Sequence, residues 1–201
     1  MTAQISASKA KPARTYTLKR RAEKQAETRR RIVEAAIELH STLGPARTPL
    51  SLVAERAGVQ RHTFYAHFPD ERSLLMACSG LVFERDPAPD AGGCRGIENR
   101  RERLRTGLRA LYDWYERNAQ RAACVLRDAE VHPLVKEINV LRMGPVMAAH
   151  RDVLGAELSD RQRALLQLSL TFYTWRSLVR ESGLSQDAAV GAMVQVIEGA
   201  G

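Results

Sequence analysis

Cysteine is scarce in this sequence, and the three that occur, Cys78, Cys94 and Cys124, lie far apart. No two of them form a CxxC pair, which argues against a zinc site, and their odd number argues against a disulfide framework. We therefore expect no metal, no cofactor and a reducing, cytoplasmic environment. The alternative for Cys94, which precedes Arg95 in a glycine-rich stretch, is a redox-sensitive thiol.

Long apolar runs and aromatic side chains are also few. No stretch reaches the roughly 18 consecutive apolar residues of a membrane span, and the N-terminus lacks the apolar core of a secretory signal. We therefore expect no membrane association. Aromatic residues make up 5% of the 201 residues, whereas Ala, Leu, Arg and Glu are frequent. This composition is typical of helical proteins.

Positive charge is concentrated at one end of the chain. The net charge is +8, and residues 1–31 contain ten Lys and Arg against two Glu. The rest of the chain contains equal numbers of basic and acidic residues. A local basic cluster is typical of a segment that binds a polyanion such as nucleic acid. The alternative is a solvated basic tail without a partner.

Apolar residues recur with helical spacing along most of the chain, and no strand pattern is present. Residues 1–20 lack this periodicity, so we expect a disordered basic arm there. Residues 86–97 are rich in Pro and Gly and are expected to form a loop. Gly144-Pro145 is a candidate kink in a later helix. The expected helices, bounded by capping or breaking residues, span residues 21–43, 49–57, 60–68, 70–85, 98–118, 119–131, 133–154, 160–182 and 186–198.

The two helices on either side of Gly58 have the features of a helix-turn-helix. Leu50 and Val53 supply a packing face on the first helix, and Gly58 permits a tight turn. Phe64 and Phe68, four residues apart, anchor a short second helix. The major groove of DNA is about 12 Å wide and admits one such helix. Its outward polar residues, expected to face the groove, are Gln60, Arg61, His62, Thr63 and His67.

The segment from Thr48 to Phe68 resembles the DNA-binding signature of TetR-family regulators. The resemblance rests on Ala57-Gly58-Val59, Thr63-Phe64-Tyr65 and His67-Phe68 at fixed spacing. It covers roughly residues 22–80, and beyond residue 85 it is only architectural. It implies a regulator and no enzyme, most simply a homodimeric repressor that a small-molecule effector releases from double-stranded operator DNA.

With this resemblance the sequence predicts an all-α fold of two domains. The N-terminal three-helix helix-turn-helix DNA-binding domain would span residues 21–68, and a connecting helix 69–85. A larger helical domain over 98–201, which in the family binds the effector and forms the dimer, would follow the loop. The helices after Ser159 and Ser185 would form the dimer interface.

The resemblance also implies roles for single residues. Arg61 and His62 would face base edges, and Arg can bind guanine in a bidentate way. Thr63 would touch a base edge or a thymine methyl group. Thr48, Tyr65 and His67 would contact phosphates. The basic residues expected to reach along the backbone or into the minor groove are Lys19, Arg20 and Arg21.

Three positions depart from the family pattern. Gln60 is a weaker helix cap than the usual Ser. His62 replaces a commonly small residue, which would alter base preference. Glu71 stands near a position where a Lys often binds phosphate, and its repulsion of DNA could be offset by the neighbouring Arg72.

The C-terminal half offers aromatic, Met and His side chains for a ligand pocket between helices. The alternative is that they are ordinary core residues. The candidate pocket residues are Trp114, Tyr115, Met143, Met147, His150, Phe172 and Trp175. Two other functions stay open at this point. One is a non-specific architectural DNA-binding protein, and the other is a helical enzyme, although no nucleophile–base pair, metal cluster or phosphate loop is evident.

Overall fold

The computed structural model describes residues 13–201, and in this range the expected all-α fold is confirmed. The N-terminal elements are α1 (Ala13–Thr42), the 3-10 turn η1 (Pro45–Arg47), α2 (Leu50–Arg56), α3 (Arg61–His67) and α4 (Glu71–Arg85). The C-terminal elements are η2 (Ala91–Cys94), α5 (Arg100–Arg117), α6 (Ala119–Ala129), α7 (Pro133–Leu154), α8 (Asp160–Ser169), α9 (Phe172–Trp175), the π-helical turn η3 (Arg176–Glu181) and α10 (Gln186–Glu198). None of these helices has both the length and the apolar character needed to cross a membrane.

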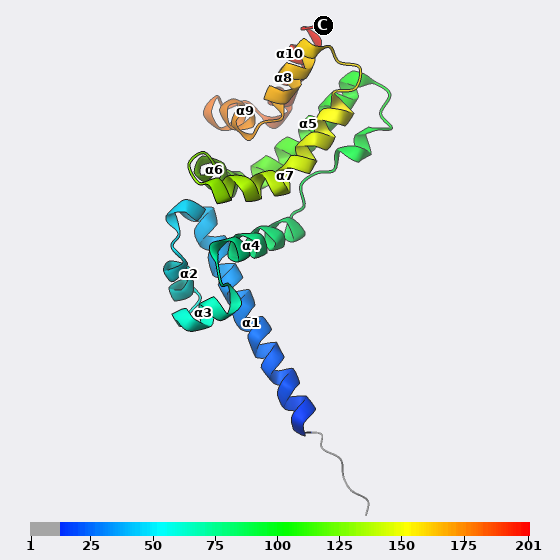
Figure 1. Cartoon of the computed structure of the whole chain (residues 1–201). Coiled ribbons are helices and arrows are strands. Elements are labelled where there is room, and N and C mark those ends of the chain that lie inside the picture. Colours follow the sequence, from blue (N-terminus) through cyan, green and yellow to red (C-terminus); the bar gives the residue numbers. More distant parts are fainter. Residues whose placement is uncertain (1–12) are drawn as a thin grey trace, which may run out of the picture.

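The first helix is longer than the sequence predicts. It begins at Ala13, so residues 13–20, expected to belong to a disordered arm, are helical, and residues 1–12 of that arm lie outside the described residues. Its N-terminal half projects away from the other helices (Figure 1). Lys, Arg, Gln and Glu are good helix formers that need no apolar cover. The helix therefore continues through the basic segment, although its side chains from Leu18 onward become buried only at Ile32.

The N-terminal helices share one apolar core. Phe64 and Phe68 of the expected short helix are 1% and 0% exposed, and they pack against α1 and α4. Asp70 caps α4 as expected, accepting a hydrogen bond from the Ser73 backbone N–H at 2.7 Å. Val135 and Ile138 of α7 belong to the same core. The core of the N-terminal unit is therefore completed by a helix from the C-terminal half.

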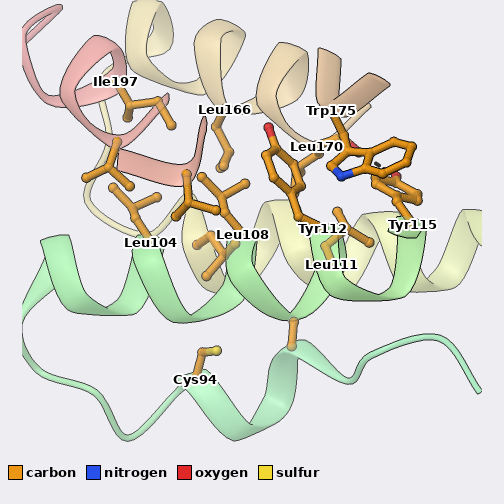
Figure 2. Close-up of a cluster of buried hydrophobic side chains, with 14 of the residues drawn as sticks. Cys94, Leu104, Leu108, Leu111, Tyr112, Tyr115, Leu166, Leu170, Trp175 and Ile197 are labelled. Atoms are coloured by element: carbon orange, nitrogen blue, oxygen red, sulfur yellow. Dashed lines mark hydrogen bonds between the residues drawn. The ribbon is translucent and has the colours of Figure 1, made fainter. Parts of the chain in front are cut away.

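The C-terminal core is built around α5 (Figure 2). Leu104, Leu108 and Leu111 lie along one face of this helix and are fully buried. They pack against residues of α7, α8, α9 and α10, among them Leu166 and Trp175. Long apolar side chains at helical spacing account for this arrangement, because each one removes its surface from water.

The segment expected as one helix over 160–182 is interrupted, which corrects that expectation. It starts as predicted, with a capping box between Ser159 and Gln162. It breaks at Thr171, whose backbone is extended and whose hydroxyl caps α9 by accepting from the Thr174 N–H at 3.1 Å. Two tyrosine hydroxyls from α5 stabilise the break: Tyr112 donates to the Ser169 carbonyl at 3.0 Å and Tyr115 to the Leu170 carbonyl at 2.7 Å.

Candidate DNA-binding surface and interior cavity

The helix-turn-helix is formed by α2, the turn at Gly58 and α3. Gly58 has φ +63°, a left-handed conformation that Gly adopts without strain. The Val59 N–H then bonds back to the Ala54 carbonyl at 3.0 Å, which closes the turn. The turn predicted from the sequence is thus present, and it sets α3 across α2 (Figure 1).

The outer face of α3 carries the expected polar residues. Gln60, Arg61 and His62 are exposed, whereas Thr63 and His67 are half-buried. Gln60 is the N-cap residue but makes no side-chain capping bond, in agreement with its weak capping propensity. Thr63 Oγ1 lies 3.2 Å from His62 Nε2.

Arg61 and Tyr65 form a pair on this face. The Arg61 guanidinium lies 5.6 Å from the centre of the Tyr65 ring, within the range of a cation–π contact. Tyr65 is 38% exposed, and Arg61 makes no ion pair with any described carboxylate. The charge of Arg61 is therefore free to meet a base edge or a phosphate.

Thr48 is placed differently from the prediction. It does not cap α2, whose N-cap residue is Pro49. Its side chain is buried, and its hydroxyl donates to the Gly44 carbonyl at 2.7 Å. A phosphate contact through this hydroxyl would therefore require that bond to break.

The basic residues of α1 follow two patterns. Lys19, Arg20 and Arg21 are exposed on the projecting part of the helix, which is helical and not an extended arm. Arg29, one turn before the buried part of α1, lies over the Phe68 ring at 4.8 Å from its centre. That contact ties Arg29 to the helix-turn-helix core.

Arg72 does not offset Glu71 in the way expected from the sequence. It forms an ion pair with Glu137 of α7, and Glu71 lies 3.4 Å from His132 Nε2. Both side chains of α4 are thus directed to the region where α7 begins. Arg72 and Glu71 are adjacent in sequence, but each lies closer to a partner near the start of α7 than to the other.

A group of hydrogen bonds, here called the clasp, joins α6 to the turn that precedes α2 and was not predicted from the sequence. Asp128 is 3% exposed and accepts from the Ala46 N–H at 2.9 Å and from Arg127 Nε at 2.8 Å. Arg127 also donates to the Leu43 carbonyl at 2.7 Å. Gly44 has φ +99°, and a Cβ there would collide with the Asp128 carboxylate. Only the Gly44-Pro45 turn was visible in the sequence, because its partner lies more than 80 residues away.

A cavity of about 370 Å³, partly open to solvent, lies between the N-terminal and C-terminal helices. Five of the seven predicted pocket residues line it: Trp114, Tyr115, Met143, Met147 and Phe172. The other two do not, which corrects the prediction. His150 is buried with Nδ1 2.8 Å from the Val146 carbonyl oxygen, and Trp175 donates from its indole to Gln186 Oε1 at 2.9 Å.

The cavity wall also includes side chains of α1 and α4 that the sequence did not single out. His40 of α1 and Cys78 of α4 lie with Nδ1 and Sγ 3.5 Å apart. Burial lowers the pKa of His40 to about 4, partly opposed by the charge of Asp128. Burial also raises the pKa of Cys78 to about 12. Both groups are therefore neutral at pH 7.

Cys94 lies in η2 beneath α5 (Figure 2). It is 5% exposed, and burial raises its pKa. Because the thiolate is the reactive form, these surroundings argue against the redox-sensitive alternative. Cys94 acts here as a small core residue.

Comparisons with known proteins agree with this geometry. The sequence profile described as bacterial regulatory proteins, tetR family, matches residues 32–78. The HTH-type transcriptional repressor KstR of Mycolicibacterium smegmatis is 40% identical over 76 residues, which are 35% of this chain and 37% of that protein. The HTH-type transcriptional regulator TtgR of Pseudomonas putida is 42% identical over 67 residues, 33% and 32% of the two chains. The matches thus span about a third of these relatives.

Solved structures resemble a larger part of the chain. A protein of a Rhodococcus species described as a TetR-family transcriptional regulator has a TM-score of 0.55 at 20% identity, covering 87% of this chain and 98% of its own. A Clostridium perfringens protein described as a fatty acid metabolism regulator has a TM-score of 0.58 at 16% identity, covering 83% and 96%. At such identities the likeness shows a shared fold. Residues 32–78 match the description of the tetR family, so the N-terminal part of the chain is similar to bacterial regulatory proteins of that family.

Proposed function

We propose that this protein is a sequence-specific DNA-binding transcriptional regulator, acting as a repressor that a small-molecule effector releases from its operator. The observation that carries the proposal is the exposed polar face of α3, held by the buried Phe64 and Phe68. A rigidly anchored short helix with free polar side chains is suited to the major groove. The description of KstR as a repressor supports the direction of control.

The first test is DNA binding itself. Fluorescence anisotropy would compare a labelled DNA from upstream of the gene with a scrambled DNA, at two salt concentrations. A preference of about a hundredfold or more for the upstream DNA supports a specific regulator. Equal, salt-sensitive binding to many sequences would instead favour the architectural alternative. An enzyme is the least supported alternative, because KstR and TtgR are both described as transcriptional repressors or regulators.

Arg61→Ala is expected to weaken binding to the preferred DNA by about five- to 150-fold, which corresponds to the roughly 1–3 kcal/mol of a bidentate base contact. The same anisotropy titration measures it. Binding to scrambled DNA is expected to change much less, because non-specific binding is shared among many phosphate contacts. Arg95→Ala, at an exposed arginine outside α3 and the helices α8 and α10, is the matched control. An equal loss on both DNAs would mean that Arg61 contacts only phosphate.

We further propose that α8 and α10 form a homodimer interface. They pack together and leave apolar side chains outward, with Leu168 54% and Val196 45% exposed. A dimer would set two recognition helices about 34–36 Å apart, one turn of DNA. Such a regulator would act in the cytoplasm of a bacterium, where the DNA lies.

Leu168→Glu is expected to weaken dimerisation at least about tenfold, or about 1.4 kcal/mol, because it places a charge in the interface. Size-exclusion chromatography with light scattering measures the mass, and DNA affinity should fall with it. Val140→Glu is the control, since Val140 is 59% exposed but lies on α7. A dimer that survives Leu168→Glu but not Val140→Glu would move the interface to α7.

The cavity supports release by an effector. Its wall combines Ile37 and His40 of α1 with Trp114 of α5 and Met147 of α7. A ligand in it would touch both the helix-turn-helix unit and the C-terminal helices. It would shift the equilibrium between arrangements of the two only as far as its affinities for them differ.

A further inference from the structure

The cavity wall is positively charged and contains no described carboxylate. Its surface is mainly apolar, but Arg121 of α6 and Arg142 of α7 both reach it. Among the described residues neither arginine forms an ion pair, and no Asp or Glu lines the wall. A cationic or strongly basic ligand would therefore meet repulsion, whereas an anion would find an unpaired opposite charge.

Arg121 is the less satisfied of the two arginines. It is half-buried, and it donates a hydrogen bond to the neutral side-chain oxygen of Asn118. The nearby Asp86 is already engaged by Arg117 at 3.1 Å and by the Asn118 amide at 2.6 Å. One carboxylate thus faces two arginines, and the cluster retains one excess positive charge. In agreement, loss of hydration lowers the pKa of Arg121 despite the attraction of Asp86.

Arg142 is held by neutral partners on α4. Its Nε donates to Ser79 Oγ at 3.1 Å and its Nη2 to the Met76 carbonyl at 3.0 Å. These bonds fix the guanidinium against α4. Arg121 is therefore the cation that a ligand can approach with less rearrangement.

The size of the cavity limits the ligand. A cavity of about 150 Å³ holds benzene, with its six carbon atoms, so about 370 Å³ corresponds to roughly fifteen non-hydrogen atoms. Aromatic and apolar side chains form most of the remaining wall, including Trp114, Phe172 and Leu126. This surface suits a hydrocarbon or aromatic body rather than a sugar or a nucleotide.

We infer that the ligand of this cavity is a small amphipathic carboxylate, whose anionic group pairs with Arg121 while its apolar body lies against the aromatic wall. The inference rests on the proposed function for its regulatory meaning, but the binding can be measured without DNA. A charge-assisted hydrogen bond in a partly enclosed, mainly apolar site discriminates between a carboxylate and a neutral group of the same length.

Isothermal titration calorimetry with decanoate, decanol and decylammonium tests this directly on the full chain. We expect decanoate to bind at least about tenfold more tightly than decanol, and decylammonium to bind weakest. Arg121→Gln is expected to reduce this preference to less than about threefold and to leave decanol affinity unchanged. Arg121→Lys should keep most of the preference. Arg105→Gln, which removes an exposed arginine outside the cavity, is the control and should change nothing.

Three results would overturn the inference: no decanoate binding up to about 1 mM, a preference for decanol or decylammonium, or an unchanged preference in Arg121→Gln. Unchanged decanol affinity shows that the variant is folded, and circular dichroism checks this independently. DNA binding of the same preparation, measured without ligand, tests the proposed function separately. A protein that binds DNA but prefers decanol refutes the carboxylate and leaves the regulator standing.

Discussion

Asp128→Ala is expected to lower the free energy of unfolding by about 2 to 3 kcal/mol, which for a chain of this size lowers Tm by roughly 5 to 10 °C. The carboxylate is buried and accepts from the Ala46 N–H and from Arg127. Losing a buried charged acceptor removes both bonds at once. Arg127 is exposed enough to be hydrated, which keeps the cost below that of a fully buried pair. Thermal and urea unfolding measure the change.

The same variant is expected to weaken DNA binding, because Asp128 and Arg127 hold the turn that leads into α2. Asp152→Ala is the matched control. Asp152 pairs with Arg95 on the surface, with its side chain 69% exposed, and such pairs contribute little. An equal free energy of unfolding for Asp128→Ala and the wild type would show that these hydrogen bonds do not stabilise the turn before α2.

Stability is expected to fall by about 3 kcal/mol between pH 6.5 and pH 4 through His40 alone. Burial lowers the pKa of His40 to about 4, whereas in the unfolded chain it returns to about 6.5. The unfolded chain therefore takes up a proton that the folded chain does not. The contribution is fully present above pH 6.5 and is lost as the pH falls toward 4.

Urea unfolding of the wild type and of His40→Gln across pH 4 to 7.5 isolates this contribution, because the carboxylates titrate in both proteins. The difference between the two curves should shrink as the pH falls. His62→Gln, at an exposed histidine, is the control and should keep the wild-type dependence. A difference that stays constant with pH would show that His40 titrates normally in the folded chain.

Local signals in the sequence predicted most of the fold. The caps at Asp70, Ser159 and Ser185 mark the observed starts of α4, α8 and α10. The exposed polar face of α3 follows from the spacing of the buried Phe64 and Phe68. These features depend on neighbours along the chain, so the sequence contains them directly.

What could not be predicted depends on partners distant in sequence. The break at Thr171 is stabilised by tyrosine hydroxyls of α5, more than 50 residues earlier. The clasp at Asp128 joins α6 to the turn at Ala46, and His40 of α1 lies beside Cys78 of α4 in the cavity wall. The basic start of α1 was missed for a different reason. Its residues are good helix formers but lack an apolar stripe, so a search for apolar periodicity does not find the helix.

The sharing of Val135 and Ile138 with the N-terminal core has a consequence for engineering. A fragment ending after α4 would expose the apolar surface that these two α7 side chains cover, and an exposed patch of this kind promotes aggregation. We therefore do not expect the helix-turn-helix unit to fold well when it is excised and fused to another domain. A chimera that is to keep the proposed DNA specificity must also carry the start of α7 and the end of α6, or redesign the surface that they cover.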